Sequence, residues 1–326
     1  MILRLAFVLL SLLLVTGCGD SDDTGKTTVT LYSSIDGPYL EPIVAAFENE
    51  HPDIDVTVVT DTEATKSVGL AERLRAEAAR PRANVWWGNE PFYTVALARD
   101  GLLVPHEPTS ADDIRPLFRD PENRWIGNGL RVRVLVHEPT DTPAGLADLA
   151  TRGGFAARPT AGTTGGHVAA LYVTLGEAAF DQLMHDWHNA GLRLVAGNSF
   201  VVREVANADA AIGLTDNDDV ANAIARGMTV AMTVPDQNEG GLGTLAIPTT
   251  VGLVAGSENN AAAKLLADFL VSAKAEQMLT DAGFIAFSVR DDQTPLRVME
   301  IDYAAVAEQM PEAIRRATAI LEGRQP

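Results

Sequence analysis

The stretch VTLYSSIDGPYLEPIVAAFE, residues 29–48, decides the fold class. Its β-branched and apolar start predicts a strand over 28–33, and apolar residues at helical spacing then predict a helix over 38–50. The same order returns in strands at 55–59 and 84–87 and helices at 67–79 and 93–99. Strands that alternate with helices form βαβ units, so we expect an α/β fold with a mostly parallel sheet.

A second α/β set follows Gly129 and ends at Gly240, Gly241 and Gly243. Its expected elements are strands at 130–136, 192–195, 210–214 and 229–234 and helices at 165–175, 180–190, 200–206 and 220–226. An apolar strand over 245–254 and helices at 261–270, 275–282 and 303–321 complete the chain. We therefore predict two α/β lobes with a cleft and a two-strand hinge, lobe 1 being 28–129 plus 246–326 and lobe 2 being 130–245. Such a cleft can close around a solute.

The N-terminal sequence has the layout of a signal for export from the cytoplasm. Arg4 precedes an apolar run that is shorter than the roughly 20 residues of a membrane-spanning helix, as in a secretory signal peptide. The residues LVTGC before and including Cys18, the one cysteine, resemble the bacterial lipobox. We expect a signal peptide over 1–17, a lipidated Cys18 and a polar tether over 18–27. The alternative is a buried free thiol beside an ordinary signal peptide.

Composition excludes several classes of function. The formal net charge of −19 argues against nucleic acid and anionic lipid surfaces as partners, so contact with the membrane is expected through the lipid alone. One cysteine allows neither an intramolecular disulfide nor a thiolate metal cluster. No HExxH, GxSxG or EF-hand pattern is present, so we predict a binding protein rather than an enzyme, monomeric and without a cofactor.

Acidic residues follow several predicted strands, where ligands bind in open α/β sheets. Asp36 follows the first strand, and helix capping and ligand binding explain it equally well. Glu63 follows the second strand, and Glu90 follows the third, after Trp86 and Trp87. Because adjacent strand residues point to opposite faces, we expect one tryptophan in the core, while the other could hold a cation over its ring.

The second lobe offers a glycine-rich helix start and a dense acidic loop. Glycines around Thr163, Thr164 and His167 suit an anion or an oxygen-rich ligand, although most histidines are structural. Asn198 follows a strand and most simply caps a helix. Asp216, Asp218 and Asp219 repel one another and could form a solvated cap, but their place after a strand favours a functional site.

Seven segments together resemble the solute-binding proteins of bacterial ABC importers, which have the type 2 periplasmic-binding fold, and are most similar to the ferric-iron-binding branch. They are residues 29–48, 85–103, 131–139, 161–176, 197–205, 214–219 and 243–256. The resemblance implies an extracytoplasmic protein, periplasmic or on the cell surface, that delivers a solute to a permease with an ATPase.

The resemblance also implies a ligand set. The family's iron-binding histidine falls on Asp36, its glutamate on Glu90 and its paired tyrosines on Asp218 and Asp219. Without the phenolates this is still an anionic, all-oxygen set, and hard cations favour such ligands. An anion bound beside the metal would use Thr163, Thr164 and Arg131 or Arg133.

We therefore predict a lipid-anchored binding protein for a cation, foremost a metal ion. One alternative is an organic cation such as a polyamine, held by the same carboxylates and a tryptophan. Another is an exported hydrolase or a sensor module that transports nothing.

Overall fold

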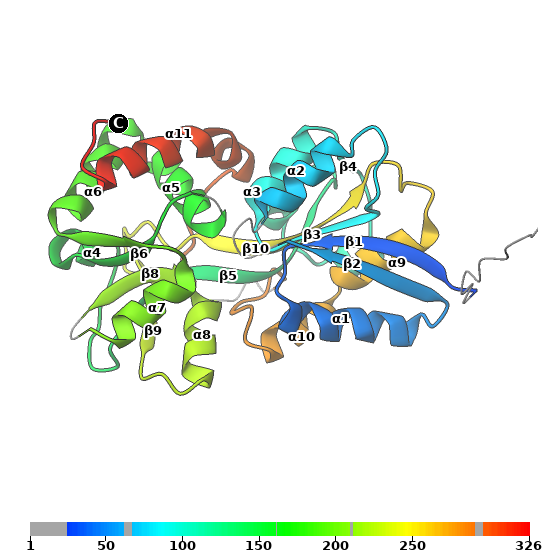
Figure 1. Cartoon of the computed structure of the whole chain (residues 1–326), viewed down its shortest axis with the longest axis horizontal. Helices are drawn as coiled ribbons and strands as arrows, with labels where there is room; N and C mark the ends of the chain where they lie inside the picture. The colour runs from blue at the N-terminus through cyan, green and yellow to red at the C-terminus, as the bar shows by residue number, and fades with distance from the viewer. Residues whose placement is uncertain (1–24, 62–66, 161, 209–210, 291–295) are drawn as a thin grey trace, which may run out of the picture.

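The computed structural model describes residues 25–61, 67–160, 162–208, 211–290 and 296–326. Two groups of α/β elements lie side by side and are joined by two long strands (Figure 1). The strands are β1 (Thr27–Ser33), β2 (Ile54–Thr60), β3 (Val85–Gly88), β4 (Leu103–Val104), β5 (Ile126–His137), β6 (Gly154–Ala157), β7 (Leu192–Val195), β8 (Ile212–Asp216), β9 (Ala231–Thr233) and β10 (Ala246–Val254).

The helices cover both sides of these strands. They are α1 (Gly37–Glu50), α2 (Val68–Ala76), α3 (Pro91–Arg99), α4 (Ala147–Arg152), α5 (Gly162–Leu175), α6 (Glu177–Asn189), α7 (Asn198–Ala206), α8 (Asn217–Ala225), α9 (Ala261–Leu270), α10 (Ala273–Asp281) and α11 (Tyr303–Leu321), with 3₁₀ turns at Thr109–Ala111 and Pro116–Phe118. Among the helices in the described ranges, none is both long and apolar enough to cross a membrane.

The strands follow the order β2-β1-β3-β10-β5-β8-β6-β7, with β4 added to β10 and β9 to β5. β1 runs parallel to β2 and β3, and β6 runs parallel to β7 and β8. β5 pairs antiparallel with β10 over 126–132 and with β8 over 133–137. β10 pairs with β3 and with β5. β5 and β10 therefore form the two-strand connection that the sequence predicts.

The centre of the sheet is covered on both faces, which explains why both tryptophans are buried. Trp86 and Trp87 are both fully buried, and their indole N–H groups donate to Thr94 at 2.7 Å and Thr249 at 3.3 Å. The core placement expected for one of them therefore holds for both, because both faces of this central strand are packed. Neither ring is available to a cation.

Helix α11, which the sequence analysis places with lobe 1, lies over α5 and α6 in Figure 1. Arg316 pairs with Asp181 on α6. At the other end of α11, the ring of Tyr303 lies 6.1 Å from that of Phe92 on α3, and its hydroxyl donates to the Ala246 carbonyl at 2.9 Å. The helix thus contacts both predicted lobes, whose boundaries remain predictions.

Candidate functional site

The carboxyl ends of the parallel strands open onto one large cavity of about 740 Å³. Asp36, Ser67 and Asn89 reach it from the first predicted lobe. Most of its wall follows β6, β7 and β8 in the second lobe. Ligands bind at this edge of open α/β sheets. The cavity is within the size range of small-molecule sites.

A buried ion-pair network forms the floor of this cavity. Arg133 donates to Asp216 at 2.6 Å, and Thr163 and Asn198 donate to the other oxygen of Asp216 at 2.7 and 2.9 Å. Burial alone would raise the pKa of Asp216, but Arg133 and Arg131 hold it below its usual value. Asp216 is therefore an ionised carboxylate that pairs with two arginines inside the protein.

Arg131 joins the two predicted lobes at the base of the cavity. Its Nη1 lies 3.3 Å from Asp216 and 3.3 Å from Asp218, and its Nη2 donates to the Asn89 carbonyl at 2.5 Å. Burial would lower the pKa of Arg131, but Asp218 and Asp216 raise it above its usual value. The guanidinium is thus a fixed positive charge inside the acidic cluster.

The acidic cluster lies where β8 meets α8. One carboxylate oxygen from each of Asp216, Asp218 and Asp219 lies within 4.8 Å of the others, a spacing that could hold a metal ion. Asp218 is buried, and Asp219 is half-buried. Both lie in the first turn of α8, where the helix N-terminus favours negative charge.

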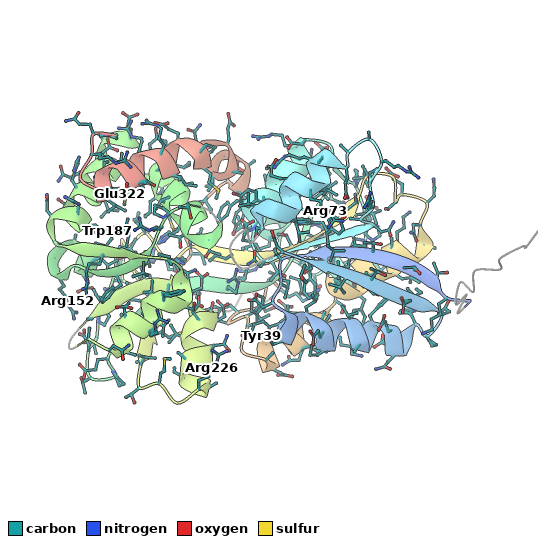
Figure 2. The ribbon with its side chains drawn as sticks, in the orientation of Figure 1. Tyr39, Arg73, Arg152, Trp187, Arg226 and Glu322 are labelled. Atoms are coloured by element: carbon teal, nitrogen blue, oxygen red, sulfur yellow. The ribbon has the colours of Figure 1, made fainter. Side chains whose placement is uncertain are left out.

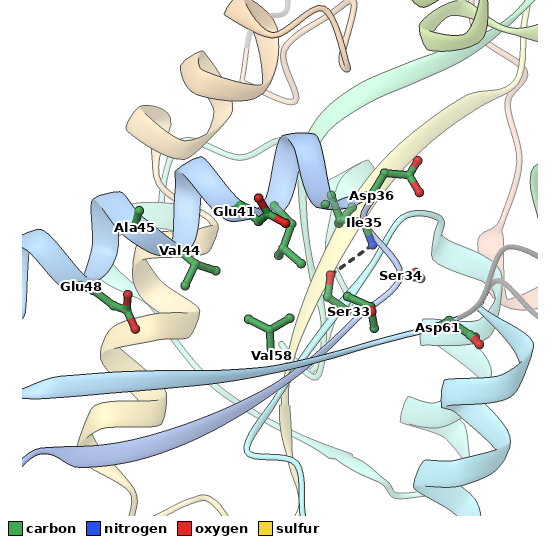
Figure 3. A pocket seen from close by; sticks show the side chains of 13 residues that line it. Ser33, Ser34, Ile35, Asp36, Glu41, Val44, Ala45, Glu48, Val58 and Asp61 are labelled. Atoms are coloured by element: carbon green, nitrogen blue, oxygen red, sulfur yellow. Dashed lines mark hydrogen bonds between the residues drawn. The ribbon is translucent and has the colours of Figure 1, made fainter. Parts of the chain in front are cut away.

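Asp36 stands at the junction of this cavity and a second pocket. The second pocket, of about 430 Å³, lies between α1 and the strands β1 and β2 (Figure 3). Asp36 lines both spaces, and its side chain does not hydrogen-bond the first turn of α1 although it occupies the N-cap position. The structure therefore gives Asp36 a place in the cleft rather than a capping bond.

Glu90 does not line the cavity. Its carboxylate accepts hydrogen bonds from the Phe92 and Tyr93 backbone N–H groups at 2.7 and 3.2 Å, which caps α3. Burial raises the pKa of Glu90 to about 7, against lowering by these two bonds and by Arg131. Its neighbour Asn89 reaches the cavity instead, and the Asn89 side chain accepts from Ser67 and Ser34 at 2.8 and 3.2 Å.

The other expected residues divide between wall and core. Thr163, Thr164 and Asn198 line the cavity, and Thr164 donates to Asn198 at 3.2 Å. His167 is buried behind them, where burial and Arg133 lower its pKa to about 3. Glu63, Cys18 and residues 1–17 lie outside the described residues.

Tyr39 is a residue that the sequence analysis missed. Asn222 on α8 donates to its hydroxyl at 2.6 Å, which links the two predicted lobes across the cleft. Figure 2 shows Tyr39 on α1 and Arg226 at the C-terminal end of α8, the helices on either side of the cleft. Burial raises the pKa of Tyr39, and Asp218, Asp36 and Asp219 raise it further. The sequence signal was available, because Tyr39 directly follows the Asp36 loop.

Comparison with known proteins identifies the family. The sequence profile of the bacterial extracellular solute-binding proteins matches residues 29–285. The chain belongs to this family. No curated protein matches the sequence at a significant level.

Solved structures that resemble this solute-binding protein share its two-lobed fold. Iron-bound HitA from Pseudomonas aeruginosa is 21% identical over 89% of this chain and 99% of its own, with a TM-score of 0.76. The ferric binding protein from Campylobacter jejuni is 19% identical over 90% and 99%, with a TM-score of 0.78. AfuA from Actinobacillus pleuropneumoniae, solved with fructose-6-phosphate, is 19% identical over 89% and 97%, with a TM-score of 0.74. At these identities the likeness establishes the fold.

Proposed function

We propose that the protein is the lipid-anchored solute-binding component of an ABC importer. It captures a cationic solute between its lobes and delivers it to a permease with an ATPase. The observation that carries this proposal is the cavity whose walls bring Asp36 from one lobe to Asp218 and Asp219 from the other. A cation between these carboxylates would offset their repulsion and favour the closed form.

The cluster of carboxylates where β8 meets α8 supports a positively charged group of the solute at that place. Asp216 is neutralised by Arg133 and Arg131 in the floor. Arg131 lies 3.3 Å from Asp218, and Asp36, Asp219, Arg158 and Arg226 line the same cavity. Buried carboxylates are stabilised by a nearby opposite charge, which a bound cation would supply.

A metal ion is the first candidate for the solute. Asp218, Asp219 and Asp36 bring carboxylate oxygens to the cavity, and hard cations prefer such ligands. HitA and the Campylobacter protein, which share the fold, are described as iron-bound and ferric-binding. The proposed ligand set leaves out Glu90, because it does not line the cavity, and Asp216, because Arg133, Thr163 and Asn198 surround its carboxylate.

An organic cation is the second candidate, and two observations favour it. A cavity of about 740 Å³ has room for far more than one ion. Arg131 already places a positive charge 3.3 Å from Asp218, where a metal bound to the same oxygen would meet it. The fold alone does not determine the charge of the ligand, since AfuA, which shares the fold, was solved with a sugar phosphate.

The test begins with protein purified without chelators. Metal analysis and native mass spectrometry of this protein would identify a metal ion or an organic cation carried through purification. Titration calorimetry of the Asp219→Asn variant with the identified solute should show affinity weaker by about 5- to 150-fold, the effect of a lost charge-assisted contact of roughly 1–3 kcal/mol.

The matched control is Asp53→Asn, which changes an exposed aspartate in the turn before β2. It should bind as the wild type does. Equal affinity in the wild type and both variants would reject the proposed site. Genes for a permease and an ATPase beside this gene would separate transport from the exported hydrolase and sensor alternatives.

A further inference from the structure

One end of the cleft cavity is lined by apolar side chains. Phe200 on α7 and Met228 after α8 both reach it, with exposed fractions of 41% and 38%. Val202 and Ala223 are buried beneath the same wall. Large apolar side chains left exposed in a binding groove are suited to contact with an apolar partner.

Helix α8 connects this apolar end to the acidic end. Asp219, Asn222, Ala223 and Arg226 all line the cavity, and their spacing places them on one face of the helix. At 1.5 Å per residue, Ala223 lies about 6 Å along the axis from Asp219, and Arg226 about 10 Å. Along this face the wall therefore changes from the anionic Asp219 through the small Ala223 to the cationic Arg226 over the length of a small organic molecule.

The far end of this wall carries positive charge. Arg226 lines the cavity beside Met228, and the guanidinium of Arg203 lies 4.3 Å from the centre of the Phe200 ring. A solute with a second cationic group at this end would face like charge. The arrangement thus opposes a second cationic group on the solute.

We propose that the solute is an amphipathic monocation, with one ammonium-like group near Asp218 and Asp219 and a hydrocarbon body that covers Phe200 and Met228. This inference rests on the proposed cation site and names the class of solute that it takes. It favours this class over a polyamine, whose distal amine would lie near Arg226, and over a bare metal ion, which would make no contact with the apolar wall.

Three probes of defined chemistry test the inference by titration calorimetry on the wild-type protein. They are hexylamine, 1,6-diaminohexane and manganese(II) chloride. Hexylamine presents the ammonium group and the hydrocarbon body, the diamine adds the distal charge, and Mn²⁺ has the charge alone. We expect hexylamine to bind more tightly than the diamine.

Variants of the apolar wall give the decisive comparison. Phe200→Ala should weaken hexylamine binding about five- to tenfold, because roughly half of an exposed ring face loses its contact with the ligand. Met228→Ala should act in the same direction. Leu265→Ala is the matched control, since Leu265 is 43% exposed on α9 and does not line the cavity. None of these changes should alter Mn²⁺ binding.

The results separate this inference from the proposed function. If Asp219→Asn weakens Mn²⁺ or diamine binding while hexylamine does not bind, the cation site stands and the amphipathic class is wrong. Unchanged hexylamine affinity in Phe200→Ala and Met228→Ala also overturns the inference. Failure of all three probes to bind would overturn this inference, while the proposed function would still be decided by the titration of Asp219→Asn with the solute identified after purification.

Discussion

Glu90 provides a pH-dependent test of how the structure uses its acidic residues. Burial raises its pKa to about 7 from the ordinary 4.5. Between these two values the folded state keeps a proton that the unfolded state has lost. The free energy of unfolding contributed by this group is therefore full below about pH 4.5 and is lost as the pH rises through about 7.

The size of the effect follows from the shift. A change from 4.5 to about 7 corresponds to roughly 3 kcal/mol at 1.36 kcal/mol per pKa unit. Glu90→Gln removes the titration and retains one amide oxygen to accept from the α3 N-terminus. We expect the free energy of unfolding of the variant, measured relative to that of the wild type, to rise by about 3 kcal/mol between pH 4.5 and pH 8. This rise should appear whatever the difference in stability between the two proteins at pH 4.5.

Urea unfolding of both proteins across this pH range measures the difference directly. His167, whose pKa is lowered to about 3, gives stability that is lost as the pH falls from about 6.5 toward 3. That contribution is common to both proteins and cancels in the comparison. Glu107→Gln, at an exposed position, is the control and should follow the wild type. If the difference in the free energy of unfolding between Glu90→Gln and the wild type is constant with pH, the raised pKa of the buried Glu90 carboxyl is refuted.

Three further predictions concern the network, the cleft and the anchor. Asp216→Asn should lower the free energy of unfolding by about 3–5 kcal/mol, because it leaves Arg131 and Arg133 buried without their shared carboxylate; a loss below about 1 kcal/mol in urea unfolding would contradict this. Tyr39→Phe removes the hydrogen bond from Asn222, so the ligand-free protein should show a larger radius of gyration by small-angle scattering; an unchanged radius would mean that this bond does not hold the lobes. Cys18→Ser should release the protein from membranes on cell fractionation, and unchanged retention would argue against lipidation.

Much of the fold could be predicted because its elements are strongly periodic. The helix expected at 303–321 and the strand expected at 192–195 agree with the structure to the residue. Helix α4 and strand β6 were missed, because Gly154–Ala157 is short and lacks β-branched residues. The packing of α11 on α5 and α6 could not be predicted, since an amphipathic pattern gives the buried face of a helix but not its partner.

The candidate site was harder to predict, because a sequence gives position along a strand but not the partners of a side chain. Asp36, Asp218 and Asp219 each follow a strand, and all three line one cavity, while their role as ligands stays a prediction. The same rule applied to Glu90, but its carboxylate turns inward to the α3 N-terminus. The buried strand β5 did contain a usable signal, because arginines within an apolar run require acidic partners.

The Arg131 guanidinium already makes an ion pair with the carboxylate of Asp218, where we propose that a cation binds. Any cation that binds the Asp218 oxygen must replace the guanidinium that lies 3.3 Å away, so its measured affinity is the difference between two ion pairs. The same guanidinium holds the Asn89 carbonyl of the opposite lobe and is carried by β5, one of the two connecting strands. Replacement of Arg131 by another counterion at Asp218 would therefore change the contacts of a residue on one of the two strands that connect the predicted lobes. A cation that enters the proposed site would therefore have to interact with Asp218 more strongly than Arg131 does.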